Sequence, residues 1–153
     1  MESVVPTRAE LDAVRVRRAE LLGSLNFLEL TLAAPAWGRA VVWGETVHDA
    51  LVTMAGDFGA HIEVTEGPGG LHQAILGGDL RLTNAVDALT GEHAEMAAEI
   101  ESLVADSDAP VTSADVDSLR DRATQLLGHL VRHRQRGADL IYEAYQTDIG
   151  GGD

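Results

Sequence analysis

Three histidines fall on the apolar stripes of three different segments of this chain. Each stripe steps by alternating threes and fours, the spacing that keeps side chains on one face of a helix. The stripes are Val47, Leu51, Met54, Phe58 and His61; Leu82, Val86, Leu89, His93, Met96, Ile100 and Leu103; and Val116, Leu119, Ala123, Leu126, Leu130 and His133. Imidazoles that project inward from facing helices are how helical bundles build metal sites. The spacing therefore predicts that His61, His93 and His133 meet in a bundle core and bind a metal ion.

The helices that must position these rings are delimited by caps and breakers. Thr7 to Glu10 and Thr112 to Asp115 fit capping boxes, and Asp79 is a good N-cap. Pro35 and the run Gly67-Pro68-Gly69-Gly70 interrupt the apolar stripes, because neither residue type extends a regular helix. The expected helices span 7–33, 37–66, 80–105 and 114–146, with a further short turn of helix over 71–76 and a frayed tail over 147–153.

Four long amphipathic segments joined by short connections predict an all-α fold, an antiparallel up-down-up-down four-helix bundle. The composition agrees, because 45% of residues are hydrophobic but only 4% are aromatic, and aromatic residues favour strands. Residues 1–153 are of a length expected for one domain. The expected bundle has two helical hairpins, over 1–77 and 78–153.

The charge balance restricts the partners. With 25 acidic and 11 basic residues the formal net charge is −14, which opposes binding to nucleic acid or to an anionic membrane. The chain has no cysteine, so thiolate metal sites, disulfides and cysteine nucleophiles are excluded. Residues 1–18 lack the apolar core of a signal peptide, and we expect a cytoplasmic protein. The charge does not exclude a homo-oligomer, because contact through an apolar face can overcome the charge repulsion.

The histidine pattern resembles a hemerythrin-like domain, also called an HHE cation-binding domain. In that family one helix of each hairpin carries a His in a Glu-His context, and the following helix carries a His with a carboxylate four or five residues later. The matching pairs are Glu92–His93, His61 with Glu66, and His133 with Asp139. The resemblance implies a four-helix bundle with a di-iron centre in its core that binds a small ligand such as oxygen.

The chain also departs from the family pattern. No histidine lies near Leu25 or Asn26, and Ala97 stands where a further His is expected, so three of the family's five histidine positions are filled. Glu66 and Asp139 are each displaced by one residue, which is about 100° of rotation on a helix. We therefore expect a reduced site that binds one divalent metal, iron or another, through three histidines. Glu66, Glu29 or Asp139 would supply a further ligand.

The remaining histidines have weaker spacing. His129 lies four residues before His133, but Leu126 and Leu130 fit the core step better, so it is placed on the flank of the helix. His48 is expected to be exposed, and His72 to lie in the connection after the Gly-rich break.

Three functions follow from this pattern. The first is metal binding for small-ligand or oxygen binding or for redox sensing. The second is a metal-free interaction module that keeps the fold while the site has decayed, with each His hydrogen-bonded to a neighbour. The third is catalysis at the metal with Glu66 as a base; nothing in the sequence demands turnover, and an enzyme is not the first choice.

Overall fold

Helices make up almost all of the computed structural model, which describes the backbone of residues 8–150 and the side chains of residues 8–145. The elements are α1 (Arg8–Ala33), α2 (Ala40–Glu66), α3 (Leu71–Gly78), the 3-10 turn η1 (Leu80–Leu82), α4 (Thr83–Ser107) and α5 (Ser113–Gly150). No strand occurs in residues 8–150, so the prediction of an all-α fold is confirmed. None of the helices in this range is both long enough and apolar enough to cross a membrane.

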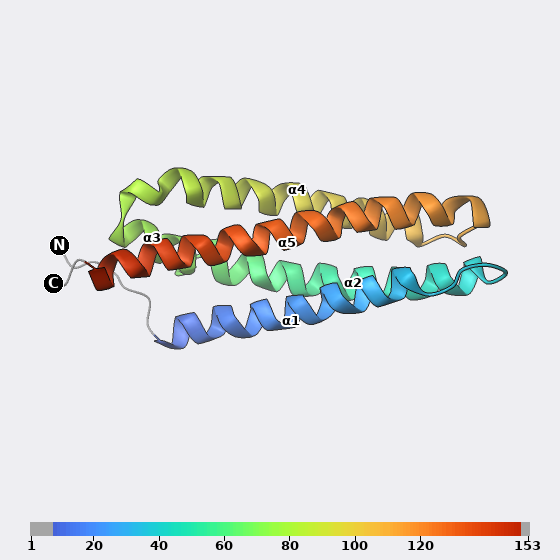
Figure 1. Cartoon of the computed structure of the whole chain (residues 1–153), viewed down its shortest axis with the longest axis horizontal. Coiled ribbons are helices and arrows are strands. Elements are labelled where there is room, and N and C mark those ends of the chain that lie inside the picture. Colours follow the sequence, from blue (N-terminus) through green and yellow to red (C-terminus); the bar gives the residue numbers. More distant parts are fainter. Residues whose placement is uncertain (1–7, 151–153) are drawn as a thin grey trace.

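The four long helices lie side by side along the longest axis of the molecule (Figure 1). In this view each of them begins at the end of the molecule where the preceding long helix finishes. The short helix α3 lies at the end where α2 finishes and α4 begins. Helix α2 packs against α1 and α4, and α4 packs in turn against α5.

The helix boundaries follow the breakers closely. Helix α2 begins at Ala40 instead of residue 37, because Gly38 has a φ of 72°, in the left-handed region that breaks a right-handed helix. The Asp79 carboxylate accepts a hydrogen bond from the backbone N–H of Arg81, as an N-cap does, although a 3-10 turn precedes α4 there. Asp115 accepts from both the backbone N–H and the hydroxyl of Thr112, which agrees with the predicted capping box.

The ends of the chain complete this comparison. Thr7 lies outside the described residues. Helix α5 continues through residues 147–150, where a frayed tail was expected, and residues 151–153 lie outside the described range.

The core consists of two apolar clusters. The larger runs along α1, α2, α4 and α5 and contains residues with no exposed surface, such as Leu28, Leu51 and Leu126. The smaller one includes residues of α3 and consists of Val14, Leu71, Ile75, Leu82, Val86, Leu89 and Leu140. The histidines occupy the layer between these clusters, since the cavity that they line is walled by members of both.

Truncating a side chain of the larger cluster should test this packing. Leu28→Ala removes buried methyl groups and leaves a void, so we expect the free energy of unfolding to fall by about 2–5 kcal/mol. Leu30→Ala on the same helix is the matched control, because 72% of Leu30 is exposed, and it should change stability by no more than about 0.5 kcal/mol. Urea unfolding of both variants measures this difference, and equal losses would contradict the assigned core face of α1.

Candidate metal centre

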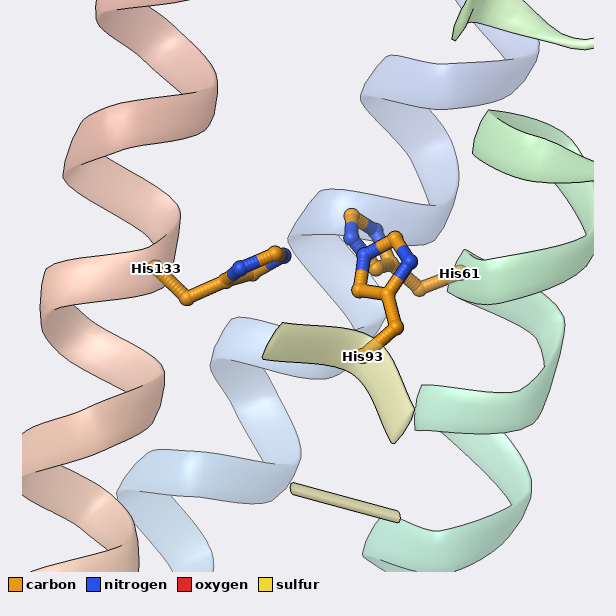
Figure 2. A group of neighbouring side chains, drawn as sticks. All are labelled: His61, His93 and His133. Atoms are coloured by element: carbon orange, nitrogen blue, oxygen red, sulfur yellow. The ribbon is translucent and has the colours of Figure 1, made fainter. Parts of the chain in front are cut away.

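The three predicted histidines come together in the core. His61 projects from α2, His93 from α4 and His133 from α5, and Figure 2 shows their rings turned toward one another. One ring nitrogen from each lies within 4.8 Å of the others. The ring centroids are 5.2 Å apart for His61 and His93, 5.8 Å for His61 and His133, and 4.6 Å for His93 and His133. The prediction that these residues meet is confirmed.

Two of the rings are fixed by carboxylates on neighbouring helices. His93 Nδ1 lies 2.9 Å from Glu66 Oε2, and His133 Nδ1 lies 2.7 Å from Glu92 Oε2. Because an ionised carboxylate only accepts hydrogen bonds, each Nδ1 carries the proton and each Nε2 keeps its lone pair. A carboxylate behind the far nitrogen of a metal-binding histidine orients the ring and makes it a better ligand. His93 and His133 are therefore held as Nε2 donors.

Two ring nitrogens of the histidine cluster lack protein partners. Nε2 of His93 and Nδ1 of His61 are buried without a hydrogen bond to any described residue. The Thr65 hydroxyl donates to the backbone carbonyl of His61 and is not a partner of His61 Nδ1. A buried polar atom without a partner costs roughly 1–3 kcal/mol. A metal ion that accepts these lone pairs would remove that cost, so the residues present fit a bound metal.

The protonation state of the cluster also suits metal binding. Burial, followed by the closeness of other imidazoles, lowers the pKa of His61 and of His93 from 6.5 to about 3. Burial and then the positive charge of Arg18 lower the pKa of His133 to about 4. All three rings are neutral at pH 7, and the neutral imidazole is the form that binds metal.

The three rings line a cavity of about 40 Å³. Most of its wall is aliphatic, with Leu25 from α1 and Leu130 from α5 among the side chains that close it. Two cationic residues also line it, Arg18 on α1 and Arg134 on α5. The cavity therefore combines nitrogen donors, apolar walls and positive charge.

The structure does not bring the three proposed carboxylate ligands into the cluster of ligand atoms. Glu66 lies behind His93 at its Nδ1 instead of beside its Nε2. Glu29 is exposed on α1, and Asp139 is exposed on α5, where it accepts a hydrogen bond from Gln135. The displacement of one residue on a helix explains the outcome for Asp139, which is turned by about 100° from the buried face.

Other residues of this site were missed or misplaced by the sequence. His72, assigned to a connection, belongs to α3, is 6% exposed and lines the cavity. Its ring stacks in parallel on His93, with centroids 5.8 Å apart. The apolar step from Leu71 through His72 to Ile75 was a signal for this burial. Glu92 was noted only as part of the Glu-His pair, and nothing in the spacing of Arg18 indicated its place at the cavity.

The two remaining histidines lie apart from the cluster. His129 is partly exposed and bonds through Nδ1 to Glu99, as expected for the flank of the helix. His48 was expected to be exposed, but only 21% of its side chain is, because its ring reaches from α2 to Ser107 at the end of α4.

Comparison of the chain with protein-family models, curated proteins and solved structures finds no match. The candidate metal centre is accordingly defined by the geometry of His61, His93 and His133.

The lowered pKa values predict how stability depends on pH in the metal-free protein. Below about pH 6.5 the unfolded chain takes up protons on histidines that stay neutral in the fold. These histidines therefore leave the free energy of unfolding unchanged above that pH and lower it as the pH falls toward 4. Each ring contributes a slope of about 1 kcal/mol per pH unit. Unfolding by urea between pH 7 and 5, with chelator present, measures the slope.

A variant pair assigns that slope to the cluster. His61→Leu should flatten it by about one quarter, because burial lowers the pKa of four histidines at the cavity, including His72, and one of them is removed. Thr53→Ala, at an exposed residue of the same helix that does not titrate, is the matched control and should leave the slope unchanged. The same slope in wild type and His61→Leu would contradict the assignment.

Proposed function

We propose that this chain is a metal-binding helical bundle that holds one divalent ion through His61, His93 and His133. The observation that supports the proposal is the convergence of three buried ring nitrogens within 4.8 Å, two of them on rings backed by carboxylates at Nδ1. The donors would be Nε2 of His93, Nε2 of His133 and one ring nitrogen of His61.

The donor set favours one metal over two. Di-metal centres in bundles use inward carboxylates in addition to histidines. Here the group of ligand atoms contains three imidazoles and no carboxylate. Three neutral nitrogens with a further position free suit Zn²⁺ or Fe²⁺. The resemblance to the hemerythrin-like family favours iron, in an antiparallel up-down-up-down arrangement of the helices.

A bound metal would supply an open coordination position and, as iron, a redox couple. The protein's own residues determine what reaches that position. The wall is mostly aliphatic, and the volume of about 40 Å³ suits a small ligand such as oxygen. Binding of such a ligand, or sensing of the redox state, is the function that follows, in a cytoplasmic protein. Glu66, the base considered from the sequence, is engaged with His93 and does not lie beside the three nitrogens.

Metal content is the decisive measurement. Mass spectrometry of untagged protein, purified without chelator and without air, should give about one iron or zinc per chain. The metal should raise the melting temperature, because a ligand at 100 times its Kd that binds only the folded state adds about 2.7 kcal/mol. Near two irons per chain would restore the di-iron site. No metal, even after reconstitution, would refute the proposal and leave a metal-free interaction module.

Substitution of one ligand should remove the metal. His93→Gln keeps a hydrogen-bond donor for Glu66 but loses the nitrogen lone pair, so we expect the stoichiometry to fall from one to near zero. His129→Gln is the matched control, because His129 lies outside the cluster and should leave the stoichiometry at one. Retention of the metal in His93→Gln would contradict the assigned ligand set.

The carboxylate behind His133 should set the affinity instead of the stoichiometry. Glu92 accepts from His133 and pairs with Arg136, and Glu92→Gln removes its charge. Loss of such a partner typically weakens metal binding about 10–100-fold. Competition with a chromogenic chelator measures the change. Glu95→Gln, exposed on the same helix, should bind as wild type does; equal affinity in all three proteins would show that Glu92 does not tune the site.

A further inference from the structure

The charge around the cavity is opposite to the charge of the chain. Acidic residues outnumber basic ones by 25 to 11 overall. The cavity is nevertheless lined by two arginines, Arg18 and Arg134, and by no aspartate or glutamate among the described residues. This local reversal shows that the space beside the histidines is built to be positive.

Arg18 is the arginine whose charge reaches the rings. It is half-buried on α1, and its positive charge acts on both His61 and His133. Its guanidinium donates one hydrogen bond, from Nη2 to the backbone carbonyl of Arg134 at 3.2 Å. A guanidinium has five N–H groups, so most of its donors remain available.

Unlike Arg17 and Arg122, Arg18 has no carboxylate partner within the described part of the chain. Arg17, its neighbour on α1, pairs with Glu20, and Arg122 pairs with Asp106. Half-buried positive charge without a partner is costly, and an anionic ligand is the partner that would compensate it.

A bound metal would increase this imbalance. The ion would bring two positive charges next to Arg18, while three imidazoles contribute none. Glu66 and Glu92 lie behind the rings, and the charge of Glu92 is already compensated by Arg136. In a site of low dielectric constant the remaining positive charge favours an anion that touches both the metal and the guanidinium.

We propose that the open position of this centre takes a small monovalent anion, held between the metal and the Arg18 guanidinium. This inference rests on the proposed metal site and names the class of its ligand. The size follows from the cavity: about 40 Å³ takes roughly three or four heavy atoms at 10–15 Å³ each. With one place taken by the metal, anions of two or three atoms fit and larger organic acids do not.

The experiment uses the full chain loaded with Co²⁺, whose visible absorption reports both metal binding and a change of ligand. Azide, a linear anion of three heavy atoms, is the probe, and benzoate is the oversized comparison. Azide should shift the cobalt bands of the wild-type protein in a saturable way, and benzoate should not. Arg18→Met keeps most of the apolar stem of the side chain and removes its charge. We expect it to bind azide at least about tenfold more weakly, the loss typical of a charge-assisted hydrogen bond.

Two further variants make the result specific. Arg18→Lys restores the charge and should recover part of the affinity. Arg15→Gln removes an exposed arginine of the same helix that pairs with Asp12, and it should bind azide as wild type does. Circular dichroism and the cobalt stoichiometry verify that each variant is folded and loaded; if Arg18→Met is not, Arg18→Gln replaces it.

The outcomes separate the two proposals. Failure of wild-type protein to bind Co²⁺ would refute the metal site, and with it this inference. Cobalt binding with the same azide affinity in wild type, Arg18→Met and Arg18→Gln would leave the metal site intact and overturn the role of Arg18. Saturable binding of benzoate would overturn the size limit. A loss of azide affinity confined to the Arg18 variants, partly recovered by Arg18→Lys, would support the proposal.

Discussion

The burial of three neutral imidazoles in one layer of an otherwise aliphatic core is the constraint on which this structure depends. A leucine at each position would satisfy the helical stripes without any polar atom to compensate. The histidines instead leave Nε2 of His93 and Nδ1 of His61 buried without a described partner. They also divide the core into the clusters on either side. Such a layer costs stability in the metal-free protein, so its arrangement is better explained by a ligand than by packing.

The carboxylates turn this layer into a connected set of helices. Glu66 of α2 accepts a hydrogen bond from His93 of α4, and Glu92 of α4 accepts one from His133 of α5. Each bond therefore fixes a ring and links two helices at the same time. Helix α1 contributes no imidazole; it contributes the guanidinium of Arg18, which donates to the backbone of α5 beside His133. All four long helices thus supply a group to the cavity. Helices α2, α4 and α5 each supply a ring nitrogen with a lone pair, and α1 supplies a positive charge.

Periodicity was sufficient to predict the elements and the three rings. His61, His93 and His133 each fall on an apolar step, and a step repeated every three or four residues determines which face a long helix buries. The carboxylates were predicted less well because their function depends on contacts across helices. The spacing of Glu66 from His61 suggested a ligand on the same helix, whereas the structure pairs Glu66 with His93 of another helix. Sequence separation on one helix carries no information about such a partner.

The same limit explains Arg18 and His72. Arg18 lies far from His133 in the sequence, and only the packing of α1 against the other helices brings its charge to the cavity. His72 follows a Gly-rich break that usually marks a connection, but the short helix α3 turns it inward to stack on His93. Residues held by long helical periodicity were therefore predictable, and residues held by tertiary contact alone were not.

Charge gives the proposed centre an order of binding. A chain with a net charge of −14 attracts cations and repels anions at long range, so it favours the approach of a metal ion and opposes that of a free anion. Once a divalent ion is held by the imidazoles, it and Arg18 make the interior positive over the few ångströms that matter for binding. The two ligands then stabilise each other, and by thermodynamic linkage the anion must tighten the metal by the same factor as the metal tightens the anion. In the proposed centre the acidic surface and the basic cavity would therefore act in sequence, the first attracting the cation and the second selecting what the cation binds.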